Sequence, residues 1–262
     1  MTNYHFEKIK TTKQFNIQLI YNSANITHQR SKEVKRTMEL KLDLHVHSMY
    51  SDDAMGTPKE IMKSIKQKGL QGFALTDHNT VDGAVKASKK LSSKDFIIIP
   101  GIEISTKDGH LLGLNVKNTI PKGLSVQRTV DLIYEDGGIP IVPHMYRNMS
   151  GIKKEKLLKI DHKIDAIEVY NGCSQPKTNS KTAQVAKKLK LGGTGGSDSH
   201  MPQYAGYAYT LIHTSNLSID SIITEIRKRN TWGTGTSLPL SYRQERMVKS
   251  VKQFFQRGLK RI

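Results

Sequence analysis

The chain has 262 residues, 36% of them hydrophobic, and holds no apolar run long enough to cross a bilayer, so we expect no membrane partner. Lys and Arg number 41 against 23 Asp and Glu, a formal net charge of +18, and a field of this sign attracts polyanions such as phosphorylated substrates or nucleic acid. Cys173 is the only cysteine, which excludes an intrachain disulfide, and the N-terminus lacks the apolar core of a secretory signal, so we expect a cytoplasmic protein.

Three segments are expected along the chain. Residues 1–37 are polar and form an N-terminal extension to which we assign no role. Residues 38–240 form the main domain, and residues 241–262 form a basic helix packed on it or extending from it. The terminal segments carry most of the excess positive charge. Two explanations are equally consistent with this charge, namely ordinary solvated surface and contact with nucleic acid.

From Lys41 onward, short apolar runs alternate with segments of helical period, which predicts β–α units around a mostly parallel sheet. Gly233 and Gly235 are expected to form a turn. The expected strands are residues 41–46, 71–76, 96–102, 110–116, 139–143, 165–170, 191–196 and 206–212, and the expected helices are residues 58–68, 81–91, 125–136, 177–189 and 218–229.

His45 and His47 end the first of these strands. Because residues i and i+2 of a strand point to the same side, the two imidazoles face a common point. Two converging imidazoles suit a divalent metal, although a His-x-His pair alone is equally consistent with hydrogen-bonded core histidines.

The other candidate ligands in this sequence also come, for the most part, directly after predicted strands. In a closed β/α barrel, the carboxyl ends of the strands meet at one rim, where active sites are built. Six histidines and three carboxylates at one rim predict a site for several metal ions, whereas His5, His28, His162 and His213 lie elsewhere. The rim candidates are His45, His47, Asp52, His78, Glu103, His110, His144, Asp198 and His200.

The motifs around these residues resemble those of the PHP (polymerase and histidinol phosphatase) superfamily over about residues 40 to 240. The motifs are Leu-His45-Val-His47-Ser-x-x-Ser-Asp52, Leu-Thr-Asp77-His78-Asn, Pro-Gly-Ile-Glu103, Pro143-His144 and Gly-Ser-Asp198-Ser-His200. The resemblance implies a distorted (β/α)7 barrel, a stand-alone metal-dependent phosphoesterase, and two or three divalent ions, Mn²⁺, Zn²⁺ or Fe²⁺.

The resemblance also implies a distribution of the ligands. One ion is surrounded by His45, His47, Glu103 and Asp198. A second is held by Glu103, His110 and His144, with Glu103 bridging. A third is held by Asp52, His78 and His200, and Asp77 supports a ligating imidazole.

Clustered metal ions lower the pKa of a bound water, so the nucleophile is expected to be solvent, with Ser48, Ser51 and Ser197 serving as hydrogen-bond partners. The predicted catalytic residues are Glu103, Asp198, His200 and Arg147. Arg147 is expected to bind a phosphate with Asn171 beside it.

A site left positive after three carboxylates meet two or three divalent ions favours an anionic substrate. We therefore expect a nucleotide, another phosphorylated small molecule or nucleic-acid ends, in preference to histidinol phosphate, with phosphate as a product. Two alternatives stay open: an amidohydrolase-like metal hydrolase, and a non-catalytic nucleic-acid-binding module with structural metal. The oligomeric state is not predicted.

Overall fold

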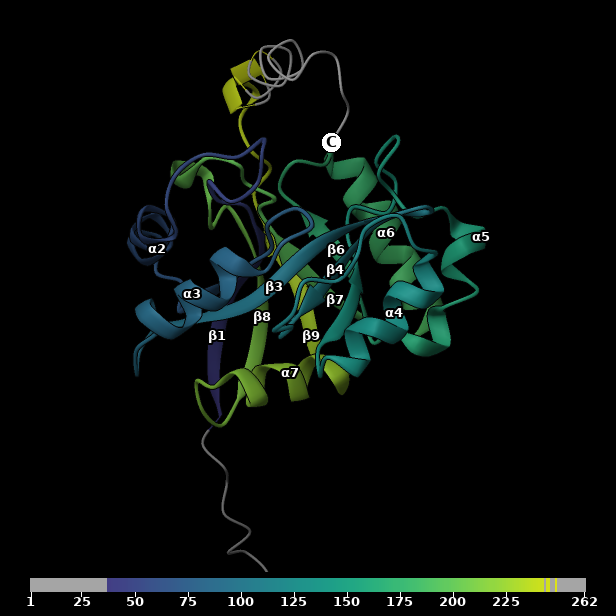
Figure 1. Ribbon diagram of the computed structural model, residues 1–262, viewed down its shortest axis with the longest axis horizontal. Coiled ribbons are helices and arrows are strands. Elements are labelled where there is room, and N and C mark those ends of the chain that lie inside the picture. The colour runs from purple at the N-terminus through teal and green to yellow at the C-terminus, as the bar shows by residue number, and fades with distance from the viewer. Residues whose placement is uncertain (1–36, 243, 246–247, 249–262) are drawn as a thin grey trace, which may run out of the picture. The chain divides into compact units, whose positions relative to one another are not determined.

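The computed structural model describes residues 37–242, 244, 245 and 248 (Figure 1). The predicted N-terminal extension therefore lies outside the described residues, as does most of the predicted basic helix after residue 241. Residues 240–242, 244 and 245 are helical. No helix in the described part of the chain is both long enough and apolar enough to span a membrane.

Nine strands form one sheet in the described part of the chain, in the order β7-β6-β5-β4-β3-β2-β1-β8-β9. Pairings among β1, β2 and β3 and among β5, β6 and β7 are parallel, while β4, β8 and β9 pair in antiparallel fashion. The strands are β1 Met38–Val46, β2 Gly72–Leu75, β3 Ile97–Thr106, β4 Gly109–Leu114, β5 Ile139–Val142, β6 Ala166–Asn171, β7 Gly192–Gly196, β8 Ala208–Thr214 and β9 Thr231–Gly235.

The helices cover the outside of this sheet and begin at residues suited to a helix start. Thr57 precedes the first helical residue, Pro58, and forms a reciprocal capping box with Glu60 in the first turn of α2. In Figure 1, α2 and α3 lie on one side of the sheet and α4, α5 and α6 on the other, with α7 below. The helices are α2 Pro58–Gln67, α3 Asp82–Leu91, α4 Val126–Glu135, α5 Lys154–Leu157, α6 Pro176–Leu189 and α7 Ile219–Arg227, and short 3-10 turns span Asp161–Lys163 and Pro202–Tyr204.

The predicted turn at Gly233 and Gly235 is wrong, because both residues belong to strand β9. Glycine has low strand propensity, but these two sit where β9 meets other backbone closely. A Cβ atom on Gly233 would lie 2.1 Å from the carbonyl oxygen of Thr194 in β7. The Thr231 hydroxyl donates to the carbonyl of Gly193, also in β7, at 3.0 Å.

These contacts bring the two ends of the sheet together into a nearly closed barrel, so the predicted barrel class is confirmed. The core inside it draws apolar side chains from strands β1 to β6, from β8 and from the inner face of α7. Its members include Leu42, Ile99, Leu112, Ile141 and Ile222, each fully buried or nearly so. This apolar packing fixes the strand ends that carry the polar cluster described next.

Candidate metal centre

The six histidines predicted at one rim are brought together by the barrel. His45 lies in β1 and His47 directly follows that strand, while His78 follows β2, His144 follows β5 and His200 comes soon after β7. His110 arrives differently, because β4 runs antiparallel to β3 and its first residues lie beside the end of β3, with Ser105 opposite His110. His162 and His213 lie on the surface, with side chains 66% and 62% exposed.

The first group consists of His45, His47, Glu103 and Asp198, all buried. The Nε2 atoms of His45 and His47 lie 3.1 Å apart. Glu103 Oε2 is 3.3 Å from the first and 3.2 Å from the second, and Asp198 Oδ1 is 3.7 and 3.6 Å from them. These four side chains converge on one point, as predicted.

The other carboxylate oxygen of Glu103 faces a second group. Glu103 Oε1 lies 2.8 Å from His110 Nδ1 and 2.8 Å from His144 Nε2. One buried carboxylate therefore serves two groups of imidazoles, which is the arrangement expected of a bridging ligand.

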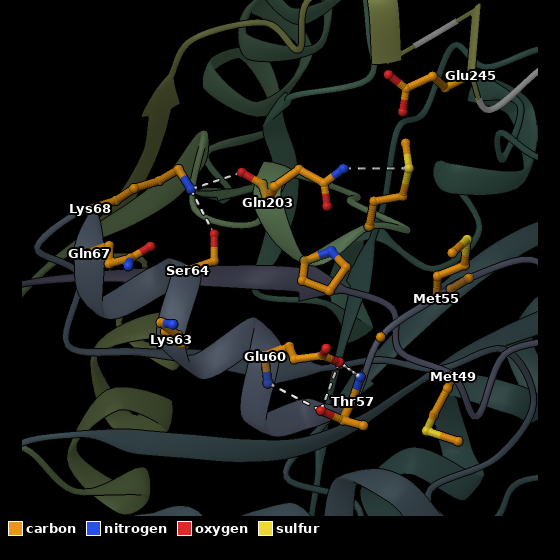
Figure 2. Close-up of a pocket in the computed structure, with 14 residues that line it drawn as sticks. Met49, Met55, Thr57, Glu60, Lys63, Ser64, Gln67, Lys68, Gln203 and Glu245 are labelled. Carbon is orange, nitrogen blue, oxygen red and sulfur yellow. Dashed lines mark hydrogen bonds between the residues drawn. The ribbon is translucent and has the colours of Figure 1, made fainter.

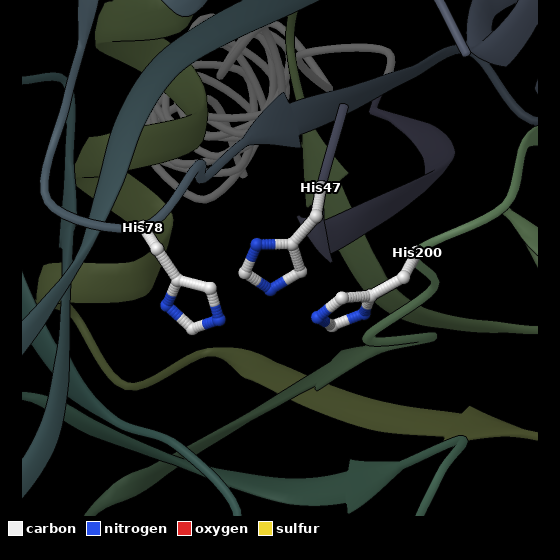
Figure 3. Close-up of side chains that lie close together, drawn as sticks. All are labelled: His47, His78 and His200. Carbon is white, nitrogen blue, oxygen red and sulfur yellow. The ribbon is translucent and has the colours of Figure 1, made fainter. Parts of the chain in front are cut away.

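The third group contains His78 and His200, whose rings flank that of His47 with centroids 4.5 and 4.1 Å away (Figure 3). Its carboxylate is Asp53 rather than the predicted Asp52. Asp53 Oδ2 lies 3.1 Å from His200 Nε2 and Asp53 Oδ1 lies 3.8 Å from His78 Nε2. The turn after Ser51 leaves Asp52 on the surface and directs Asp53, only 11% exposed, toward the rings.

Glu168 is a buried carboxylate that we did not select from the sequence. Its Oε1 lies 3.0 Å from His45 Nδ1, and its Oε2 accepts from the backbone N–H of His144 at 2.9 Å. An acceptor at Nδ1 favours the tautomer with its lone pair on Nε2, the atom that faces the first group. The available signal was one acidic residue within the apolar strand Ala166–Asn171.

Asp77 supports the centre indirectly and not, as predicted, by direct contact with an imidazole. Its carboxylate accepts from the Ser48 N–H and hydroxyl, both at 2.7 Å, and from the Ser51 hydroxyl at 2.8 Å. The Ser51 oxygen lies 3.4 Å from His47 Nδ1. Ser48 and Ser51 thus act as hydrogen-bond partners, as does Ser197, whose N–H donates to Asp43 at 2.8 Å.

Arg147 and Asn171 both contact Asp198. Arg147 Nη2 donates to Asp198 Oδ2 and to Asn171 Oδ1. The Asn171 amide is fully buried and donates to both Glu168 and Asp198, while its oxygen also accepts from the Cys173 N–H. These contacts place the Asn171 side chain between Asp198, Glu168 and Arg147, and its substrate-binding role stays a prediction.

Burial and charge shift the proton affinities of these histidines in opposite directions. Burial alone would lower the pKa of His47, but its contacts with Asp198 and Glu103 raise that pKa to about 9. For His78 and His144, burial prevails and lowers the pKa to about 3 and about 4. Burial opposes the charged form of Glu103 too, yet the neighbouring histidines, His110 foremost, hold its pKa well below the ordinary value.

The donor set fits divalent metal ions. The Nε2 atoms of His45 and His47 lie close together, and both face the carboxylates of Glu103 and Asp198. A hydrogen atom on one Nε2 can be donated to only one of these neighbours, so hydrogen bonds alone leave some of the four groups unsatisfied. A shared cation would satisfy all four groups. His78 Nδ1 is buried, lies 3.4 Å from Glu103 Oε2 and makes no hydrogen bond with a described residue. Imidazole and carboxylate ligands together suit Zn²⁺, Mn²⁺ and Fe²⁺.

Two pockets are lined by residues that are neighbours in sequence of the cluster residues. The larger, of about 940 Å³, lies between α2, the loop that contains Met49 and Met55, and Gln203 (Figure 2). The smaller, of about 480 Å³, is lined by Arg147 and by residues next in sequence to His110 and His144.

Residues 43–230 match the family model of the PHP domain. The chain belongs to the PHP domain family. The matched region contains all the groups described above, so the resemblance noted in the sequence is confirmed.

Relatives of this PHP chain include an uncharacterized protein of Methanocaldococcus jannaschii, 35% identical over 142 residues, which are 50% of this chain and 82% of the relative. A 5'-3' exoribonuclease of Haemophilus influenzae is 32% identical over 40% of this chain and 39% of that enzyme. A probable phosphatase of Vibrio parahaemolyticus is 28% identical over 73% of this chain and 91% of that protein.

Solved structures share the PHP fold at low identity. A two-domain protein of Bacteroides vulgatus containing a predicted PHP-like metal-dependent phosphoesterase superposes with a TM-score of 0.61 at 18% identity, over 81% of this chain and 70% of that one. The lesion-specific endonuclease Q of Pyrococcus furiosus gives 0.57 at 18% identity, over 73% of this chain and 56% of that one. Endonuclease Q is also known in complex with a 27-mer duplex that carries an abasic lesion at the active site.

Proposed function

We propose that this PHP protein hydrolyses phosphate esters of nucleotides and nucleic-acid ends, with water as the nucleophile. Family membership, together with relatives named as a phosphatase and an exoribonuclease, makes it a metal-dependent hydrolase acting on ester bonds. The preference for nucleotides or nucleic acid over other phosphate esters is the proposed part, and the nuclease names among its relatives support it.

The observation that carries the proposal is the position of Glu103 among imidazoles of all three groups, with its oxygens 2.8 to 3.4 Å from nitrogen atoms of His45, His47, His78, His110 and His144. Divalent ions bound there would activate water at neutral pH and withdraw charge from a phosphoryl oxygen. We assign His45, His47 and Asp198 to one ion, His110 and His144 to a second, and Asp53, His78 and His200 to a third, with Glu103 bridging the first two.

The protein's own residues supply the remaining functions. Three carboxylates, Asp53, Glu103 and Asp198, leave two or three divalent ions with excess positive charge, which selects an anionic substrate. Arg147, 26% exposed beside Asp198, is proposed to bind a phosphoryl oxygen at the solvent side of the cluster. Glu168 and Asn171 hold His45 and Asp198 in place, so the ligands are preorganised.

The proposal is tested by measuring phosphate and nucleotide release from Mn²⁺-loaded protein. The substrates are nucleoside 3′,5′-bisphosphates, 5′-phosphorylated oligonucleotides, histidinol phosphate and cyclic amides, with Asp198→Asn as the control. We expect turnover of nucleotide substrates that the substitution abolishes. Turnover of amides alone would favour the amidohydrolase alternative, and nucleic-acid binding without any turnover would favour the non-catalytic module. The cytoplasmic location expected from the sequence stays a prediction.

A further inference from the structure

The chain that follows strand β9 returns to the metal centre and places a buried tyrosine beside it. The return is held by the backbone, since the Leu238 N–H donates to the Gly172 carbonyl at 2.8 Å. Residues 240–242 are helical, and Tyr242 is only 1% exposed. Tyr242 lies beyond residues 43–230, which match the family model. Its contacts therefore add to those made within the matched region.

The Tyr242 hydroxyl joins two parts of the segment that carries Asp198 and His200. It donates to the Asp198 carbonyl at 3.2 Å and accepts from the His200 N–H at 3.1 Å. The Cys173 thiol also lies 3.2 Å from that carbonyl oxygen, but a thiol is a weaker donor than a hydroxyl. One side chain thus links the backbones of two candidate ligands, which we assign to different ions.

The backbone conformation of this segment requires support from its surroundings. Asp198 has a φ of 54°, in the left-handed region that residues other than glycine adopt infrequently. Such a conformation persists only where the surrounding contacts hold it. Asp198 and His200 are both buried, so each would lose a hydrogen bond inside the protein if the Tyr242 hydroxyl were removed.

The Asp198 carbonyl also orients the imidazole of His200. His200 Nδ1 lies 3.0 Å from this oxygen, and a carbonyl can only accept, so Nδ1 carries the proton of the neutral ring. The lone pair then lies on Nε2, the atom that faces Asp53 Oδ2 at 3.1 Å. The Tyr242 hydroxyl therefore contacts the oxygen that fixes the tautomer of a candidate ligand.

We propose that Tyr242 is a positioning residue of the metal centre, which holds Asp198 and His200 at the spacing and orientation that bound metal requires. The inference rests on the ligand assignment made under the proposed function. Tyr242 acts through the backbone of these two residues, so loss of its hydroxyl removes no metal ligand. Metal binding should nevertheless weaken, because the ligands lose part of their preorganisation.

The test compares Tyr242→Phe with the wild type, both as full-length, metal-free protein. Phenylalanine keeps the ring, which packs with Met201, Leu238 and Tyr204, and removes only the hydroxyl. We expect the affinity for Mn²⁺, measured by titration calorimetry, to fall about tenfold, as is usual when a partner that orients a ligand is lost. The visible absorption spectrum of Co²⁺-loaded protein should also change, because it reports the geometry of the ligands around the ion.

Tyr204→Phe is the matched control. The Tyr204 ring lies edge-on to that of Tyr242 with centroids 4.9 Å apart, and its hydroxyl forms no hydrogen bond with a residue that the structure describes. This variant should bind Mn²⁺ like the wild type. An equal loss of affinity in both variants would overturn the proposal. So would reduced stability of Tyr242→Phe in urea with unchanged Mn²⁺ affinity and Co²⁺ spectrum, the result expected of a tyrosine that only packs.

A second pair of variants decides the question if Tyr242→Phe does not fold. In this pair, p-aminophenylalanine at residue 242 keeps a donor at the end of the ring, and p-methylphenylalanine fills similar space without one. We expect tighter Mn²⁺ binding with the amino group, and equal binding would overturn the proposal. Failure of the proposed function gives a different result, since wild-type protein would then bind Mn²⁺ and turn over no phosphoester.

Discussion

Glu168 contacts the metal centre from behind the ligands. Its two oxygens accept from three donors, namely the His45 ring, the His144 backbone and the Asn171 amide. A glutamine at this position has only one acceptor oxygen, and its NH₂ group would face at least one of those donors. The negative charge that favours the reactive tautomer of His45 would also be lost.

We therefore expect Glu168→Gln to lower the affinity for Mn²⁺ about 10- to 100-fold, the usual effect of removing a carboxylate partner from a ligating histidine. Titration calorimetry on metal-free protein measures this, and Glu155→Gln, on the exposed surface, is the isosteric control. Unchanged affinity in Glu168→Gln would show that the His45 ring is oriented by its packing alone.

Asp52 and Asp53 give a second prediction, because they are adjacent in sequence but differ in burial. Asp53→Asn should reduce the bound metal and lower phosphoesterase activity at least tenfold, since Asp53 lies 3.1 Å from His200. Asp52→Asn should keep most of the activity. The measurements are the metal content of each variant, by mass spectrometry, and kcat on a phosphoester. A larger loss in Asp52→Asn than in Asp53→Asn would show that Asp52 is the ligand.

At the scale of elements, the glycine-rich strand β7 brings backbone close to the ligand-bearing end of β1. A Cβ atom on Gly196 would lie 2.3 Å from the Cβ atom of His45 and 2.7 Å from its backbone nitrogen. The Asp198 N–H donates to the His45 carbonyl at 2.8 Å just beyond this contact. The absence of a side chain at residue 196 thus lets β7 approach β1 closely, which sets the distance between His45 on β1 and Asp198 after β7.

Gly196→Ala should push β7 away from β1, and overpacking of this kind costs about 1 to 3 kcal/mol of folding free energy. Urea unfolding gives the loss of stability, and metal titration should show weakened binding because His45 and Asp198 move apart. Wild-type stability together with wild-type metal affinity in this variant would contradict the close approach of the two strands.

At the scale of the whole molecule, protons and metal ions compete for the same buried site. The pKa of His47 is raised to about 9 in the metal-free protein, against an ordinary value of 6.5. A histidine with a raised pKa contributes stability that is fully present below pH 6.5 and is lost as the pH rises through 9. Metal ligands must be deprotonated, so bound metal removes this contribution.

Between pH 7 and pH 9, metal-free protein should therefore lose stability, by at most about 1.4 kcal/mol per pH unit for each histidine that titrates there. Burial alone would lower the pKa of His45, but Asp198, Glu168 and Glu103 outweigh that effect and raise the pKa well above 6.5, so His45 acts in the same direction as His47. Metal-loaded protein should show a flatter dependence. His78 and His144 do not disturb this window, because their pKa values of about 3 and about 4 leave both neutral above pH 7. The check is urea unfolding with and without bound metal, and equal pH slopes in the two forms would contradict the expectation.

The amino-acid sequence by itself predicted β–α units and most residues of the cluster, because both depend on local patterns, while the barrel class was implied by the resemblance of the motifs to the PHP superfamily. Alternation of apolar runs places strands, and a polar residue at a strand's carboxyl end lies at the rim whichever neighbours that strand acquires. His45, His47, His78, His144, His200 and Asp198 follow from this rule, whereas Glu103 lies inside β3 and His110 lies near the start of the antiparallel strand β4.

The remaining features depended on contacts between segments far apart in the chain. Whether Asp52 or Asp53 faces the rings is decided by a turn held by Asp77, and the role of Glu168 depends on the position of β1 beside β7. The Asn171 amide is buried because it donates to Glu168 and Asp198, which come from different parts of the chain. Strand β9 has the local sequence of a turn and becomes a strand only because β8 and β7 offer it partners. Side-chain direction in turns and pairing of glycine-rich segments have weak local preferences, so tertiary packing decides them.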